Sequence, residues 1–179
     1  AIGVSMDLAP VLDVDGGAGP NGRNPDGLRS FSPDLATVSR YGVAFVNGLH
    51  QGGVSAAIKH FPGLGGASAN TDYGPADTQS LSVLRTHALP SFQAAISAGA
   101  TAVMVANATV PGLTTGPASL SSAVIGSLLR NEMGFAGLVI TDSLSAGAIS
   151  AAGYSLPEAA VAAVAAGADV AVGAGCRLP

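Results

Sequence analysis

The stretch VSAAIKHFPGLGG, residues 54–66, is the part of the sequence that best indicates the fold class. It begins with a nearly continuous apolar run, reaches the polar pair Lys59-His60, and then turns at Pro62 and Gly63. A short apolar run bounded by turn residues is typical of a parallel strand buried on both faces of its sheet. Irregular loops after such strands carry binding and catalytic residues more often than core elements do. The stretch therefore predicts a buried parallel strand with polar side chains at its C-terminal end.

Runs of this kind recur along the chain and alternate with segments of helical periodicity. The sequence predicts strands over residues 4–11, 54–60, 102–106, 138–141 and 169–172. It predicts helices from Ser32-Pro33 to Gly52, over 89–97, from Ser121 or Ser122 to Gly134, and from the capping box of Ser155 and Glu158 to Gly167. Alternating strands and helices indicate βαβ units and a parallel sheet, as in α/β proteins.

Two architectures are common for such a chain, an open doubly wound sheet and a (β/α)8 TIM-type barrel. A doubly wound dinucleotide-binding fold carries Gly-x-Gly-x-x-Gly between a strand and a helix, and residues 63–66 lack that spacing. The barrel is therefore the favoured prediction.

Composition limits the classes of partner. The chain has 179 residues, 48% of them hydrophobic, which predicts one globular domain over residues 1–179. A net charge of −4 with only seven Lys or Arg disfavours a nucleic-acid or anionic-membrane partner. The single Cys176 excludes an internal disulfide, and no Cys/His cluster has zinc-ligand spacing. The Ala/Gly-rich run 159–174 is broken by Asp169 and is not a membrane span, no signal peptide is visible, and nothing indicates a cellular compartment.

Polar residues follow the predicted strands at the same end. Asp13 follows the first strand, Lys59-His60 the second, Asn107 the third and Asp142 the fourth. In a barrel, catalytic side chains come from the C-terminal ends of several strands, so these residues are expected to meet. For Asp142 the alternative is an aspartate that caps the next helix.

Lys59 and His60 are adjacent, so a regular strand points their side chains to opposite faces. The structural alternative for the pair is a lysine paired with a carboxylate such as Asp13 and a histidine bonded to backbone. Asp72, taken alone, is more often a turn former than a proton donor, and Arg29, taken alone, is more often a surface residue. His50 and His87 fall in helical stretches and are expected to be structural.

Four stretches, DLAPVLDV, RSF, KHFPGLG and GLVITDSLSAGAI, resemble the N-terminal domain of the family 3 glycoside hydrolases, especially its β-N-acetylhexosaminidase branch. The resemblance implies a (β/α)8 barrel, a carbohydrate substrate, retaining hydrolysis through a glycosyl-enzyme intermediate, and neither cofactor nor metal. It assigns the nucleophile to Asp142 and the holding of sugar hydroxyls to Arg29, Lys59 and His60. Asn107 and Asp13, at neighbouring strand ends, are expected among the substrate-binding residues.

The sequence departs from the branch where the general acid/base is expected. The branch usually has Asp-Ser-His after its Lys-His motif, whereas this chain has Asn70-Thr71-Asp72, and Leu64 stands where a second histidine is usual. Either proton donation passes to Asp72, or the site is weakened.

The resemblance begins at the fourth strand of the barrel, so only the C-terminal five βα units are expected here. Five strands cannot close an eight-stranded barrel, which predicts a fragment of a longer protein or a partner that supplies the missing N-terminal part. The predicted function is a retaining exo-β-N-acetylglucosaminidase acting on terminal β-linked GlcNAc of peptidoglycan fragments or chitooligosaccharides. The alternatives are a β-glucosidase of the same family, a carbohydrate-binding pseudoenzyme or inactive fragment, and an aldolase that uses Lys59 as a Schiff base.

Overall fold

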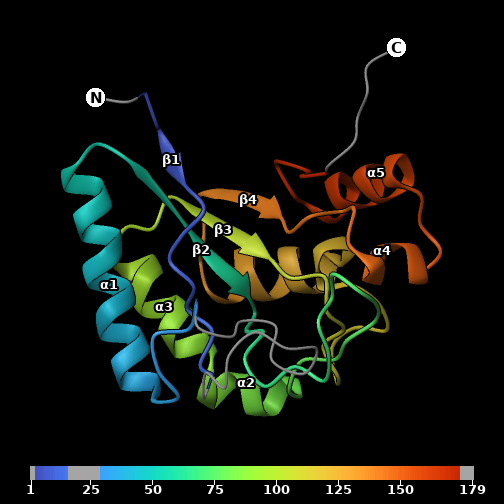
Figure 1. The fold of residues 1–179 in the computed structure, drawn as a ribbon, viewed down its shortest axis with the longest axis horizontal. Helices are drawn as coiled ribbons and strands as arrows, with labels where there is room; N and C mark the ends of the chain where they lie inside the picture. Colours follow the sequence, from blue (N-terminus) through green and yellow to red (C-terminus); the bar gives the residue numbers. More distant parts are fainter. Residues whose placement is uncertain (1–2, 16–28, 174–179) are drawn as a thin grey trace.

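The computed structural model describes residues 3–15 and 29–173 and shows an α/β arrangement built on one parallel sheet (Figure 1). Its elements in chain order are β1 (Met6–Asp7), α1 (Leu35–Gln51), β2 (Ser55–Phe61), α2 (Leu81–His87), α3 (Leu89–Ser97), β3 (Ala102–Val105), the 3₁₀ turn η2 (Ala118–Leu120), the π-helix η3 (Ala123–Glu132), β4 (Leu138–Thr141), α4 (Gly147–Ala151) and α5 (Leu156–Ala166). The strand order is β1-β2-β3-β4, with every neighbouring pair parallel. The predicted α/β class is confirmed.

Both outer predicted strands are shorter than expected. The first, predicted over 4–11, is regular only at Met6–Asp7, because Pro10 offers no backbone N–H to a ladder; the chain bonds to β2 again at Val11. The last, predicted over 169–172, is a single parallel bridge between Val170 and Ile140 of β4. In the described residues the sheet is open, and that its strands are part of a (β/α)8 barrel stays a prediction.

Successive side chains of each strand point to opposite faces of the sheet, so each face has its own set of apolar side chains. On β3, Val103 and Val105 face a core shared with the helices, where Phe61 and Phe92 of α3 meet edge to face at 5.4 Å between ring centroids. The opposite face carries a second apolar cluster, made of Ala57, Ala102, Met104 and Ile140. A strand buried on both faces is what the continuous apolar runs predict.

Most helix ends agree with their predicted signals. α3 begins and ends where expected, and α5 has the predicted capping box, with the Ser155 N–H donating to Glu158 at 2.9 Å. α1 differs, because Asp34 rather than Ser32 caps it by accepting from the Thr37 N–H. His50 and His87 lie in α1 and α2, as predicted. Cys176 lies outside the described residues.

The C-terminal end of α5 depends on glycine, which gives a testable prediction. Gly167 has φ of 107°, a left-handed conformation that costs other residues about 1–2 kcal/mol. Gly167→Ala is expected to lower the free energy of unfolding by about that amount in urea titrations. The control is Gly48→Ala inside α1, where an added methyl meets nothing within 4 Å and is expected to stabilise by about 0.5–1 kcal/mol. Equal effects of the two substitutions would contradict this explanation.

Candidate active site

The C-terminal ends of β2, β3 and β4 lie at one edge of the sheet and bring the predicted polar residues together (Figure 1). The parallel ladder sets this, because Val105 pairs with Thr141 and the next amide, that of Asp142, donates to Val105 O at 2.8 Å. On the β1 side the Leu12 N–H donates to Lys59 O. The loops after these strands therefore share one edge, as the strand-end pattern predicts.

Asp142 is half-buried and directly follows β4. Its Oδ1 accepts from the Ser143 N–H at 2.7 Å. The alternative role, capping of the next helix, does not describe it: the N-cap of α4 is Ala146, and the Gly147 and Ala148 N–H groups donate elsewhere. The carboxylate is thus positioned at the strand end without serving as a helix cap.

Lys59 is half-buried among charged groups. Burial, and then the nearby Arg29 guanidinium, lower the pKa of its amine below the ordinary value. The carboxylates of Asp142, Asp7 and Asp13 act in the opposite direction. Within the described residues Lys59 forms no ion pair, so the expected alternative, a lysine paired with Asp13, is wrong. Lys59, Arg29 and Asp142 therefore share one electrostatic environment.

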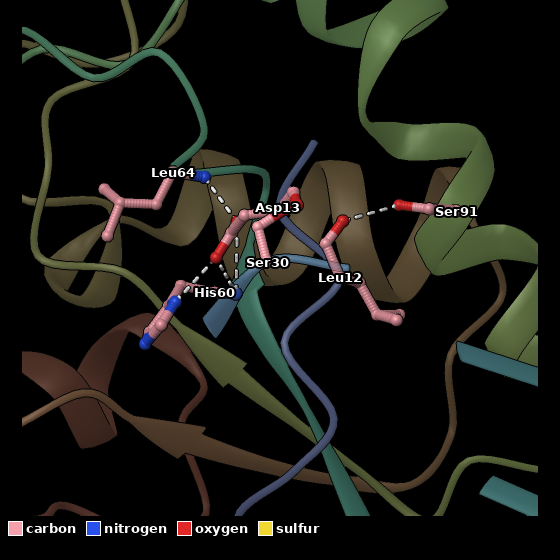
Figure 2. Close-up of polar contacts among 6 residues, drawn as sticks. All are labelled: Leu12, Asp13, Ser30, His60, Leu64 and Ser91. Atoms are coloured by element: carbon pink, nitrogen blue, oxygen red, sulfur yellow. Dashed lines mark hydrogen bonds and ion pairs between the residues drawn. The ribbon is translucent and has the colours of Figure 1, made fainter. Parts of the chain in front are cut away.

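Asp13 pairs with His60 instead (Figure 2). Its Oδ2 lies 2.7 Å from His60 Nδ1, and its two oxygens also accept from the backbone N–H groups of His60, at 3.1 and 3.3 Å, and Leu64, at 2.6 Å. Asp13 is fully buried. A carboxylate on Nδ1 fixes that nitrogen as the donor and turns Nε2 away, as Figure 2 shows. Asp13 thus holds and orients His60, and no surface of Asp13 is exposed for a sugar.

The segment that carries Asp13 is anchored on both sides (Figure 2). The Ser30 hydroxyl donates to Asp13 O at 2.7 Å, and the buried Ser91 hydroxyl of α3 donates to Leu12 O at 3.0 Å. The backbone of Leu12 and Asp13, which supports His60, is therefore fixed by hydrogen bonds from two distant parts of the chain.

Asn107 is also buried and its amide is engaged at both ends. Its Nδ2 donates to Ser143 O at 2.7 Å, and its Oδ1 accepts from the Ser119 hydroxyl at 2.7 Å. Asn107 thereby supports the backbone next to Asp142. Ser119 is a supporting residue that sequence reasoning missed, because no local pattern indicates a partner twelve residues away.

Asp72 is exposed and sits in a turn shaped by Asn70. The Asn70 side-chain oxygen accepts from the Asp72 N–H at 2.9 Å, and Asn70 O accepts from the Tyr73 N–H at 3.2 Å. An Asn bonding two residues ahead is a familiar Asx-turn. The Asn70 side chain thus serves the turn, and the turn leaves both Asp72 and Tyr73 exposed.

No cluster of three or more His, Cys, Asp or Glu that could hold a metal ion occurs among the described residues. In the same part of the chain, no helix is long and apolar enough to cross a membrane.

Comparisons with known proteins identify the family of this chain. The model of the glycosyl hydrolase family 3 N terminal domain matches residues 1–175, so the chain belongs to this family. A curated relative, the "Beta-hexosaminidase" of Stenotrophomonas maltophilia, is 38% identical over 171 residues, covering 95% of this chain and 49% of that protein. The chain therefore spans about half the length of the curated relatives it matches.

Solved structures of the family share the fold. A family 3 glycosyl hydrolase of Mycobacterium smegmatis superposes with a TM-score of 0.85 at 40% identity, over 96% of this chain and 52% of that one. A family 3 β-N-acetylglucosaminidase of Paenibacillus superposes with a TM-score of 0.87 at 39% identity, over 96% and 32% of the two chains.

Proposed function

We propose that this chain provides the nucleophile and sugar-holding residues of a retaining exo-β-N-acetylglucosaminidase that acts on terminal β-linked GlcNAc. The observation that carries the proposal is Asp142, a carboxylate at the end of a buried strand, near the Lys59 ammonium and not used as a helix cap. The names of the relatives support the reaction class, and peptidoglycan fragments or chitooligosaccharides are the substrates we propose.

In the proposed first step, an Asp142 oxygen attacks the anomeric carbon of GlcNAc and forms a glycosyl ester, while Asp72 gives its proton to the leaving oxygen. In the second step, Asp72 takes a proton from water, water oxygen bonds to the anomeric carbon, and the Asp142 carboxylate leaves. Lys59, Arg29 and His60 Nε2 hold the sugar hydroxyls. Asp13 and Asn107 act as positioning residues behind His60 and Asp142.

Leaving-group dependence tests the role of Asp72. In the full native polypeptide that contains this chain, Asp72→Asn is expected to lower kcat/KM for a 4-methylumbelliferyl β-N-acetylglucosaminide by about 10²- to 10⁴-fold. A 2,4-dinitrophenyl leaving group needs no protonation, so its release is expected to persist. Added azide is expected to attack the glycosyl-enzyme and yield the β-glycosyl azide.

Asp77→Asn is the matched control, because Asp77 is an exposed aspartate of the same loop. An equal loss with both substrates would remove Asp72 from the role of acid/base. Binding of GlcNAc without turnover by the wild type would support a carbohydrate-binding pseudoenzyme, and faster turnover of an aryl β-glucoside would support the β-glucosidase alternative.

A further inference from the structure

The turn that carries Asp72 is docked on the segment that follows Asp142. The Gly147 N–H donates to Asp72 O at 2.9 Å, and the Ala148 N–H donates to Thr71 O at 3.0 Å. These amides open α4, whose first residue lies five positions after the proposed nucleophile. The backbone that carries Asp72 is therefore bonded to the helix that begins five residues after Asp142.

Gly147 permits this docking because it has no side chain. A methyl group on Gly147 would lie 2.6 Å from the Tyr73 carbonyl carbon and 2.8 Å from its oxygen, whereas ordinary contacts begin at 3.4 Å. Both atoms belong to backbone, so no side chain can rotate away. Any substitution must move the turn or α4 by a large fraction of an ångström.

The two ends of the loop that carries Asp72 are held by contacts that do not involve Gly147. Leu64, Ala67 and Ala76 form a small buried cluster with residues after β3, and the Thr78 N–H donates to Thr109 O at 2.8 Å. A cavity of about 200 Å³ is lined by Pro75 and Ala76 of this loop and by Ala148 and Ala151 of α4. Pro75 and Ala76 are thus not closely packed against this part of α4, whereas the Tyr73 backbone passes close to Gly147.

We infer that Gly147 is a positioning residue for the general acid/base, which sets where Asp72 stands relative to Asp142. The inference rests on the proposed function. In retaining glycosidases the two carboxyl groups stand about 5–5.5 Å apart, so a small displacement of either one matters. A misplacement of about 1 Å can cost on the order of 100-fold in rate.

Gly147→Ala in the full native polypeptide tests this role. Its kcat/KM for the 4-methylumbelliferyl substrate is expected to fall about 10- to 100-fold, whereas release of 2,4-dinitrophenol is expected to stay near the wild-type rate. Added azide is expected to speed the breakdown of the glycosyl-enzyme in this variant, as it is in Asp72→Asn. Gly126→Ala is the matched control, because an added methyl there meets nothing within 4 Å.

The outcomes separate this inference from the proposed function. Equal losses with both leaving groups, or wild-type kinetics in Gly147→Ala, would overturn the positioning role while leaving the hydrolase standing. A wild type that hydrolyses neither substrate sinks the proposed function. In that case amide hydrogen exchange still decides the docking: slow exchange at Gly147 and Ala148 is expected in the wild type, and fast exchange contradicts it.

Discussion

Asp142→Asn is expected to lower kcat for hydrolysis of an aryl β-N-acetylglucosaminide by on the order of 10⁴- to 10⁶-fold, the scale of losing a catalytic nucleophile. An amide cannot form the glycosyl ester, because its oxygen is neutral and a much weaker nucleophile than a carboxylate oxygen, and its attack would leave a cationic imidate. The loss is expected with every leaving group, including 2,4-dinitrophenyl, and azide is expected to restore nothing. This pattern distinguishes a nucleophile from the acid/base residue Asp72.

The asparagine variant is chosen because it keeps the local structure. Its side-chain oxygen can still accept from the Ser143 N–H, as Oδ1 of Asp142 does at 2.7 Å. The free energy of unfolding and the affinity for GlcNAc are therefore expected to stay close to those of the wild type. Asp77→Asn serves as the control for the change of charge. If Asp142→Asn keeps more than a tenth of the wild-type kcat, Asp142 is not the nucleophile.

Sequence reasoning predicts the sheet well because the sheet is determined by local patterns. Apolar runs bounded by Gly and Pro locate β2, β3 and β4, and the parallel direction then places Lys59, Asn107 and Asp142 at one edge. α5 is predicted equally well, since a capping box at Ser155 and a left-handed Gly167 are signals contained in the helix itself.

Elements whose form depends on hydrogen-bond register or on distant packing are predicted less well. The helix after Ser122 was expected, but its π form was not, because the apolar spacing that predicts a helix does not determine which carbonyl each amide bonds. The short helices α2 and α4 carry too few periodic residues to be distinguished from loops.

Within the site, sequence indicates which residue types gather, whereas tertiary structure decides the partner of each. Asp13 is predicted to bind substrate, with pairing to Lys59 as the alternative, yet it bonds His60 and the Leu64 amide, 47 and 51 residues away. The importance of Gly147 was equally invisible, because it depends on where the backbone of Tyr73 passes. Asn70 is the exception, since an Asn two residues before Asp72 is itself an Asx-turn signal.

Asp13→Ala is expected to be the most destabilising substitution among the site residues, lowering the free energy of unfolding by about 3–5 kcal/mol. The buried carboxylate accepts from His60 Nδ1 and from the His60 and Leu64 amides, and alanine leaves all three donors buried without an acceptor. The measurement is urea unfolding of the full native polypeptide, and a loss under about 1 kcal/mol would contradict the role that we assign to Asp13.

Asp13→Asn keeps the test decisive if the alanine variant does not fold. Its single amide oxygen can accept from some of these donors, while its NH₂ group faces another N–H, so an intermediate loss of about 1–3 kcal/mol is expected. The free energy of unfolding of the surface control Asp77→Asn is expected to stay within about 0.5 kcal/mol of the wild-type value.

Asp13→Asn also tests the proposed role of His60 in substrate binding. Once the Asp13 carboxylate no longer fixes His60 Nδ1 as a donor, His60 Nε2 is no longer presented in one orientation. KM for the aryl substrate is then expected to rise more than kcat falls, since His60 is proposed to hold a hydroxyl and not to react. A fall in kcat with unchanged KM would instead place His60 in the chemical step.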